Sequence, residues 1–465
     1  MPQEHSSDFI GQEPIHKLLI KFATPSILGT FINCIYNIVD RLYIGRGVGP
    51  DAQAGLGLTF PIMIIFGAFG MMVGIGSSTI VSLLLGEKRQ DDAEKVLGQA
   101  FALFIIFVVT IQALSLIFLD KLLILFGGTE RAIPYAHQYL SIILWGNIFQ
   151  HISFGMSNLI RSEGRAYRAM FIIMLGTFLN IILDPIFISK FNLGIAGAAW
   201  ATILSMFCSS MWIILHFSFR MGVLKLRLKY IRVYPKLFTR VMSIGMAPFL
   251  MQIVHCGVVI LYNHSCNHFA DNDAHATLGI AAYSIVNTVM MCLLILPFGV
   301  MQGMQPIVGY NYGAKIYSRV RKTFIMSLNT ATALCFAMAV VMYVLAPLFA
   351  KGFTKDENLM RISIYTMRAA ATGFTFIAPG MLTSNYFQSI GKAALAMFFS
   401  LTRQVFFLLP VLIAMPRMIG FNGIWWSGPI SDTLGGVLAI AMAVHEKAFP
   451  NGGRKGLICG DGNGS

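Results

Sequence analysis

Polar side chains that can bind a cation stand inside stretches of the chain that are otherwise apolar. Asp184 lies in the stretch "FLNIILDPIF", four residues after Asn180 and directly before a proline. Residues four apart share one face of a helix, so the amide and the carboxylate would point the same way. Asp40 stands in a second apolar stretch and Thr202 in a third. An ionisable group at membrane depth is costly and therefore indicates function.

Together these side chains would offer the oxygen ligands that a small cation prefers, namely two carboxylates, an amide oxygen and a hydroxyl. Without a metal ion, two neighbouring carboxyl groups would share a proton, because both cannot ionise cheaply. The set Asp40, Asn180, Asp184 and Thr202 therefore predicts a site for Na+ or H+. Two simpler interpretations stay open: Asp40 caps its helix near water, and Asp184 bonds a neighbouring backbone group.

The elements that would position these residues are membrane-spanning helices. Of the 465 residues, 56% are hydrophobic and only 12% are charged, whereas soluble domains carry about 25% charged residues. The apolar runs are continuous and long enough to cross a bilayer, which takes about 20 residues per helix. They do not alternate as the strands of a β-barrel would. We expect an all-α polytopic membrane protein.

Breaks in the hydropathy predict twelve spans, near residues 15–43, 53–85, 96–119, 134–158, 167–189, 194–219, 240–265, 277–308, 323–349, 361–387, 394–415 and 421–445. If the N-terminus is cytoplasmic, the segments on the inner side carry most of the 34 Lys and Arg residues, as the positive-inside rule requires. Both termini are then cytoplasmic. The expected location is the plasma (inner) membrane.

The chain contains an internal repeat. Gly76 and Gly86 return as Gly303 and Gly313, each 227 positions later, and we expect these glycines to permit close helix contact. Six spans per repeat is an even number, so both halves cross the membrane in the same direction. The expected domains are an N-terminal cytoplasmic tail (1–14), a first six-helix bundle (15–219), a basic cytoplasmic linker (220–239), a second six-helix bundle (240–446) and a C-terminal cytoplasmic tail (447–465).

The repeat also provides an internal control on the cation site. Asp184 corresponds to Val411, and Asp40 corresponds to Asn263. The second half has therefore lost the carboxylates. A role in architecture would appear in both halves, so the asymmetry favours a dedicated cation site in the first bundle.

Two prolines inside spans are candidate hinges. Pro25 in the first span corresponds to Pro248 in the seventh, and proline kinks a helix because it has no backbone N–H. Pro25 lies about four turns from Asp40, so a change of charge at Asp40 could alter the bend of this span. A fixed kink without motion is the alternative.

For other polar residues inside spans, the sequence predicts a structural ion pair or contact with the substrate. Arg403 and Asp432 would reach nearly the same depth in adjacent antiparallel spans, which predicts a buried structural ion pair; a part in coupling stays open. His255 titrates near neutral pH, although a lone helical histidine more often bonds a backbone carbonyl. The residues assigned to a substrate cleft are Asn33, Tyr36, Tyr139, His255 and Met290.

Several other classes of function find no support in the sequence. There is no Walker A, HExxH or GxSxG motif, and the seven cysteines show neither metal-ligand spacing nor a disulfide framework. The net charge of +14 is spread between apolar spans, which argues against nucleic acid. We expect no cofactor other than Na+ as a candidate coupling ion, contact with membrane lipid, and a monomer.

Several segments resemble the multidrug and toxic compound extrusion (MATE) transporters, with closest similarity to their DinF-like and MepA-like branches. They are "AGLGLTFPI", "GSSTIVSLLLGEKR", "IRSEGRAYRAM", "LNIILDPIFI", "GIAGAAWAT" and "PFGVMQGMQPIVGYNYGAK". The resemblance implies two pseudo-symmetric six-helix bundles in a V-shape. It also implies antiport of amphipathic organic cations against Na+ or H+.

The resemblance carries over to individual positions. In the DinF-like branch the coupling site is a span-1 aspartate, an Asn-x-x-x-Asp pair in span 5 and a span-6 threonine, and these positions hold Asp40, Asn180, Asp184 and Thr202 here. The other large branch uses acidic residues in spans 7 and 10. This chain has no carboxylate there, so a cation site in the second bundle is not expected.

The sequence therefore favours a secondary active transporter that exports amphipathic cations in exchange for Na+ or H+ by alternating access. The alternative is a flippase for a lipid-linked saccharide or another lipid-like substrate. Such a flippase would need a basic cleft, and Arg368 and Arg403 keep this alternative open. An integral membrane enzyme would need a polar catalytic constellation at one membrane surface, and the sequence shows none.

Overall fold

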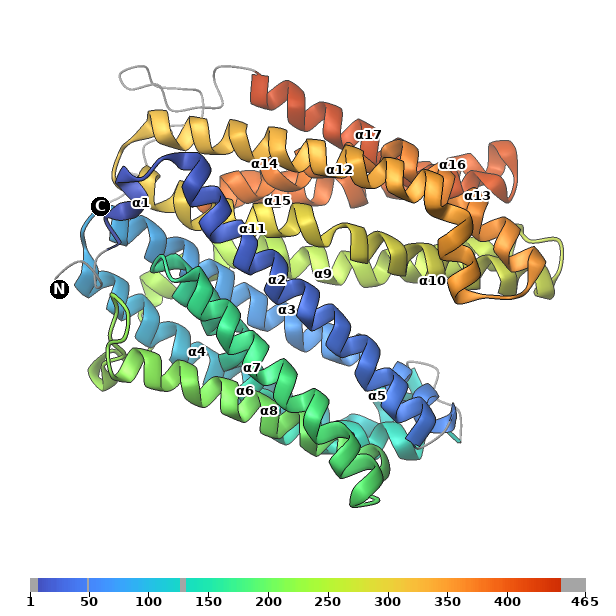
Figure 1. Ribbon diagram of the computed structural model, residues 1–465, viewed down its shortest axis with the longest axis horizontal. Coiled ribbons are helices and arrows are strands. Elements are labelled where there is room, and N and C mark those ends of the chain that lie inside the picture. The colour runs from blue at the N-terminus through green and yellow to red at the C-terminus, as the bar shows by residue number, and fades with distance from the viewer. Residues whose placement is uncertain (1–6, 48–49, 126–130, 445–465) are drawn as a thin grey trace. The chain divides into compact units, whose positions relative to one another are not determined.

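The part of the chain that the structure describes is helical throughout. The computed structural model describes residues 7–47, 50–125 and 131–444 (Figure 1). Within these ranges the chain forms helices joined by short links and contains no strand. By length and apolar composition alone, nine of the described helices could cross a membrane. The predicted all-α polytopic fold is therefore confirmed.

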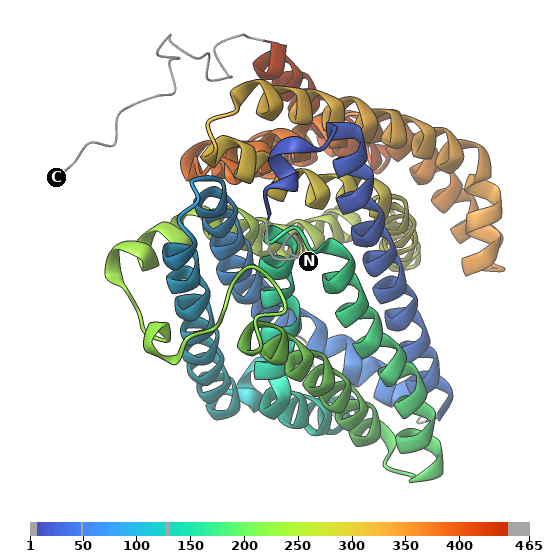
Figure 2. The same cartoon turned by 60° about the vertical axis from the view of Figure 1, so that its left-hand side comes forward.

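The first half of the chain contributes eight helices and two short segments (Figure 1, Figure 2). They are α1 (Phe9–Gln12), α2 (Ile15–Gly47), α3 (Pro50–Gly86), α4 (Gln90–Ile117), α5 (Leu119–Leu125), α6 (Ile133–Ser162), α7 (Ala166–Pro185), the π-helical η2 (Ile186–Lys190), α8 (Gly194–Ser218) and the 3-10 turn η3 (Leu228–Tyr230).

The second half begins with α9. Its elements are α9 (Pro235–Phe269), α10 (Asp273–Leu293), α11 (Ile295–Gly313), α12 (Tyr317–Phe353), α13 (Glu357–Phe374), α14 (Ile377–Ser389), α15 (Ala393–Leu401), the π-helical η4 (Thr402–Leu408), α16 (Leu409–Ile419) and α17 (Asn422–Val444). Eight of the twelve predicted spans correspond to one helix each. The other four are broken: η2 continues α7, α11 follows α10, α14 follows α13, and η4 and α16 follow α15.

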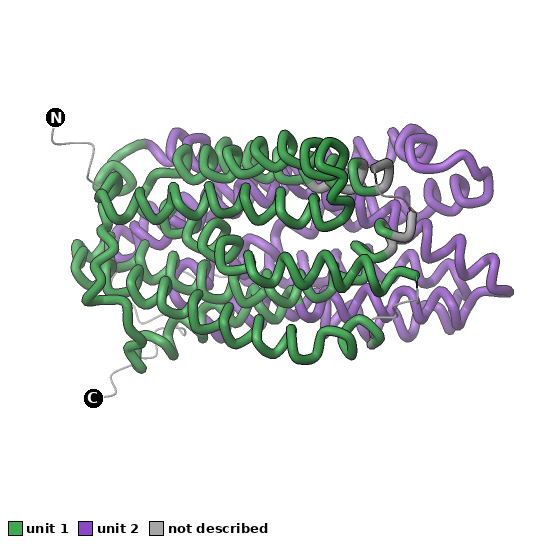
Figure 3. The backbone as a smooth tube through the Cα atoms, turned by 90° about the horizontal axis from the view of Figure 1, so that it is seen from below, with its two compact units in different colours: residues 1–13, 24–252 green, residues 14–23, 253–465 purple. Residues whose placement is uncertain are grey.

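Packing divides the chain into two compact units (Figure 3). Unit 1 holds residues 1–13 and 24–252, and unit 2 holds residues 14–23 and 253–465. The division therefore runs through α2 and α9, near Pro25 and Pro248, and not through the linker predicted from the basic residues. The linker is also shorter than expected, because α9 already begins at Pro235.

The repeated glycines explain why the units divide in this way. A Cβ on Gly76 of α3 would lie 2.3 Å from the carbonyl oxygen of Val241 at the start of α9. A Cβ on Gly303 of α11 would lie 2.8 Å from the backbone nitrogen of Ala23 at the start of α2. The same repeat position thus brings two helix backbones together in each unit, as the sequence predicted.

The N-terminal segment is more structured than the predicted tail. Residues 9–12 form α1, and Ile10 is fully buried. The ring of Phe9 packs against Gly164, which lies at φ +91° in the turn between α6 and α7. The segment from residue 7 is thus part of unit 1, while residues 1–6 and the predicted C-terminal tail (447–465) lie outside the described residues.

The close approach at Gly76 gives a direct test of this packing. Gly76→Ala would place a methyl group against a backbone carbonyl that cannot rotate away, so the helices must separate. We expect the free energy of unfolding to fall by about 1–3 kcal/mol, measured by denaturation of the purified protein in detergent. Gly67→Ala, also on α3, is the control, because a Cβ there meets no atom within 4 Å. Equal stabilities of the two variants would contradict the packing.

Candidate ion-binding site

Helix α7 carries two polar side chains into the interior of unit 1. Asn180 and Asp184 lie one turn apart on this helix, and both are buried. Asp184 is followed by Pro185, where α7 ends, and then by the π-helical η2. Single π-helical turns inside helices occur frequently at functional sites. The spacing read from the sequence therefore places both groups on a common buried face.

Asn180 joins α7 to α8 through side-chain hydrogen bonds. The orientation of its amide is assigned from its surroundings. In the orientation that satisfies both amide atoms, Nδ2 donates to Asp184 Oδ2 at 3.0 Å, and Oδ1 accepts from Thr202 Oγ1 at 3.3 Å. Thr202 lies on α8 and is itself buried. This link connects three of the four residues that the sequence singled out.

The fourth residue, Asp40, reaches the same point from α2. Its side chain is buried, and its carboxyl group lies within hydrogen-bonding reach of the carboxyl group of Asp184. Two carboxylate oxygens cannot hydrogen-bond to each other without a proton. A shared proton or a positive charge beside the pair therefore stabilises it, because two buried carboxylates repel each other.

Two tyrosines complete the cluster. Tyr36 lies one turn before Asp40 on α2, and Tyr139 lies on α6. Each hydrogen-bonds to Thr202 and lies near both carboxyl groups. The sequence assigned these tyrosines to a substrate cleft, whereas the structure groups them with the predicted ion site. The four-residue spacing between Tyr36 and Asp40 was the signal that could have found the first of them.

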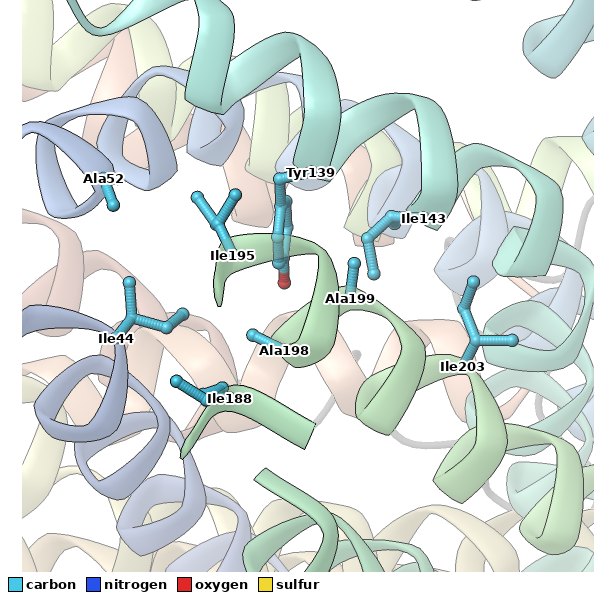
Figure 4. Close-up of a cluster of buried hydrophobic side chains, with 9 residues drawn as sticks. All are labelled: Ile44, Ala52, Tyr139, Ile143, Ile188, Ile195, Ala198, Ala199 and Ile203. Carbon is cyan, nitrogen blue, oxygen red and sulfur yellow. The ribbon is translucent and has the colours of Figure 1, made fainter. Parts of the chain in front are cut away.

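An apolar shell lies beside the cluster (Figure 4). Figure 4 shows Tyr139 reaching from α6 with its hydroxyl directed toward α8. The shell comprises Ile44, Ala52, Tyr139, Ile143, Ile188, Ile195, Ala198, Ala199 and Ile203. Such surroundings keep water away and strengthen every electrostatic interaction inside.

The donor set suits a hard cation or a proton. Carboxylate, amide and hydroxyl oxygens bind hard cations such as Na+ and Ca2+, whereas zinc and copper prefer histidine and cysteine ligands. Within the described residues, no group of three or more His, Cys, Asp or Glu side chains could hold a metal ion. The cluster of Asp40, Asp184, Asn180 and Thr202 is therefore the candidate ion-binding site.

Unit 2 contains a different charged pair. Arg403 on η4 donates from Nη1 to Asp432 Oδ1 of α17 at 2.9 Å. His255 of α9 lies near Arg403, and Tyr262 stacks on Tyr283 at 4.4 Å between ring centroids. The buried carboxylate of this unit thus has a permanent positive partner within the chain.

The contacts described for the candidate site do not include the remaining predicted residues. The side chain of Asn33 is exposed on α2, and Met290 is half-buried on α10 of unit 2. Pro25 and Pro248 lie inside α2 and α9. Nothing in their positions tests the substrate or hinge roles, which stay predictions.

The fold and the site define a class, the multi-spanning helical membrane proteins with an oxygen-lined cluster inside one bundle. The chain belongs to the MatE family, whose model matches residues 25–186 and 274–413. The multidrug export protein MepA of Staphylococcus aureus (strain MSSA476) is 24% identical over 442 residues, which cover 93% of this chain and 94% of MepA. The resemblance to MATE transporters is thereby confirmed.

Solved structures share the fold. The outward-facing conformation of a multidrug resistance MATE family transporter of the MOP superfamily matches with a TM-score of 0.87 at 22% identity, over 95% of this chain and 98% of that chain. A MOP superfamily transporter from Pyrococcus furiosus Vc1 matches with a TM-score of 0.88 at 22% identity, over the same shares of both chains. For that protein, reversed polarity of the binding pocket is taken to suggest a different function.

The link between α7 and α8 can be tested at Thr202. Thr202→Val keeps the shape of the side chain but removes the hydroxyl that bonds Asn180, so buried polar groups lose their partner. We expect the free energy of unfolding in detergent to fall by about 1–3 kcal/mol. Thr202→Ser keeps the hydroxyl and should stay close to the wild type. The network would be refuted if the valine variant were as stable as the serine variant.

The ion pair of unit 2 predicts non-additive effects. Arg403→Met leaves Asp432 buried without its partner, and Asp432→Leu does the converse. We expect each single change to cost about 3–5 kcal/mol and the double variant to cost less than either, measured as a double-mutant cycle in detergent. A stable double variant that no longer transports would give the pair a part in coupling, and additive costs would contradict the pairing.

Proposed function

We propose that this protein is a secondary active transporter that exports amphipathic organic cations in exchange for Na+ or H+. The observation that carries the proposal is the meeting of Asp40 and Asp184 inside a buried, oxygen-lined cluster of unit 1. The name of the relative MepA, a multidrug export protein, supports the export of varied compounds.

The cluster suggests how an ion would act on the protein. With a cation or proton bound, both carboxyl groups are attracted to that ion, which draws α2 toward α7. Without it, two carboxylates repel each other in apolar surroundings. The two conditions therefore favour different positions of α2 relative to α7, and an ion can drive a change of state only through such a difference.

Pro25 gives α2 a place to bend in response. The helix continues through this residue, but proline cannot donate a hydrogen bond to the preceding turn. When Asp40 shifts, α2 can therefore bend at Pro25 while the rest of the helix stays folded. Exchange would follow if the ion and the organic cation stabilise different states of the transporter.

The distribution of Lys and Arg supports a position in the plasma (inner) membrane with both termini in the cytoplasm. Family membership establishes a multi-pass membrane protein, and the sidedness is part of the proposal. No catalytic residue is assigned, since the relatives are transporters.

A flippase for a lipid-like substrate is the second candidate. Arg403 favours it, because a quarter of its side chain is exposed even within its ion pair, and a guanidinium can bind an anionic headgroup. The Pyrococcus furiosus relative, with its reversed pocket polarity, is compatible with a different cargo on this fold. The buried carboxyl pair in unit 1 nevertheless favours coupling to a cation.

The proposal is tested by replacing one carboxylate. Asp184→Asn keeps the size of the side chain but cannot hold the charge that a coupling ion needs. We expect ion-driven dye transport in proteoliposomes to fall at least about tenfold, the loss of roughly 1.4 kcal/mol or more, while the protein stays folded. Imposing the Na+ gradient and the pH gradient separately identifies the coupling ion.

The matched control is Asp120→Asn. This residue also lies in unit 1, at the start of α5, but its side chain is 77% exposed. The Asp120→Asn variant loses the same negative charge and should transport dye as the wild type does. Undiminished gradient-driven transport by the Asp184 variant would remove the coupling role from the cluster.

A further inference from the structure

The chain between α8 and α9 forms a strap, defined here as residues 219–234, which contains η3 and lies beside the first turns of α4 (Figure 2). Glu94 of α4 is fully buried and holds the middle of the strap. Its Oε1 accepts from the backbone N–H of Lys225 at 3.2 Å, and its Oε2 forms an ion pair with Arg227, whose Nε lies 2.6 Å away. The inner face of the strap is thus fixed by a buried acid.

A second buried acid holds the first part of the strap. Glu163 lies in the turn after α6, and its Oε1 accepts from the backbone N–H of Leu224 at 3.0 Å. Its Oε2 lies 3.2 Å from His216 Nε2 of α8. Gly222 approaches so closely that a Cβ there would lie 1.8 Å from Glu163 Oε2.

The last part of the strap is held by an amide. Gln99 Oε1 accepts from the backbone N–H of Tyr234 at 3.0 Å, and Gly98 contacts the backbone of Tyr230. The strap is therefore bound along its whole length to α4, to α8 and to the turn after α6. A link that served only to join two bundles would not need three buried polar anchors.

This anchoring leaves an uncompensated positive face. The strap contains no Asp or Glu, and the acids Glu94 and Glu163 are turned inward. Lys225, Lys229 and Arg232 are exposed. Asp91, an exposed acid of α4, lies 3.6 Å from Arg227, but no carboxylate in the described ranges forms an ion pair with the three exposed residues.

Aromatic rings of the strap hold two of these cations in place. Lys229 Nζ lies 4.7 Å from the ring centroid of Tyr230, and the Arg232 guanidinium lies 4.7 Å from that of Tyr234. Such cation–π contacts cost the side chain little of its ability to bind an anion, because the ring covers only one face.

Exposed apolar side chains alternate with the cations. Leu228 is 85% exposed, and Val233 is also exposed. The strap directly continues from α8 and directly precedes α9, so it lies where these spans leave the membrane. At the membrane surface, the cationic groups would face the phospholipid headgroups and the neighbouring apolar side chains would face the acyl chains.

We propose that the strap is a binding site for anionic phospholipid headgroups, with Lys225, Lys229 and Arg232 on the phosphate groups and Leu228 at the edge of the acyl chains. Charge complementarity identifies the partner, since the strap itself contains several cations and no acid, and the exposed Asp91 beside it pairs with Arg227. The proposal concerns lipid binding and does not depend on which solute is transported.

The test measures lipid selectivity in proteoliposomes that contain the full chain. Spin-labelled phosphatidylglycerol and phosphatidylcholine report the relative association of each lipid with the protein. We expect the wild type to prefer phosphatidylglycerol. The triple variant Lys225→Gln/Lys229→Gln/Arg232→Gln should lower this preference at least about threefold. In 1 M NaCl, where the Debye length is about 3 Å, the difference between the two proteins should vanish.

The control removes the same charge elsewhere. Lys351→Gln/Lys355→Gln/Arg361→Gln changes three exposed residues around the link from α12 to α13, three membrane crossings beyond the strap. It should keep the preference of the wild type. An equal loss in both triple variants, or no loss in the strap variant, would overturn the proposal. So would displacement of the lipid by millimolar inorganic phosphate, which would make the strap a site for free anions.

Discussion

The contact between two buried carboxyl groups, Asp40 and Asp184, is the constraint on which the first unit depends. The Asn180 amide that donates to Asp184 and the hydroxyls of Tyr36 and Tyr139 beside the pair are all neutral. Neutral groups can orient a carboxylate, but they cannot supply the positive charge that two of them need in apolar surroundings. In the function proposed here, a proton or a cation from solution supplies that charge. A requirement of this kind suits an exchangeable ion better than a structural one.

Unit 2 meets the same physical problem in another way. Its buried carboxylate, Asp432, is neutralised by Arg403 at 2.9 Å, so no external ion is required. Both units have a π-helical segment at the charged residue. In unit 1, η2 begins two residues after Asp184, and in unit 2, η4 contains Arg403. The halves have kept a common helical scaffold while using buried charge differently. This difference explains why only the first half carries the proposed coupling site.

The twelve spans and the repeat could be predicted because they depend on local properties. The length of an apolar run and the spacing of glycines are visible without any tertiary contact, and the close approaches at Gly76 and Gly303 follow from that spacing. The boundary between the units could not be predicted. The basic link suggested a division at the middle of the chain, whereas packing assigns the start of α2 to unit 2 and the start of α9 to unit 1.

The sequence by itself determined the class of fold and pointed to Asp40, Asn180, Asp184 and Thr202 as candidate ion-binding residues, because hydropathy marks the apolar spans in which these polar side chains stand. Only the tertiary structure decided which of these side chains meet. It brought Tyr36 and Tyr139 to the ion site and turned Glu94 and Glu163 against the strap. Such contacts depend on how each helix is rotated about its axis and packed against neighbours distant in sequence, and no local pattern fixes that rotation.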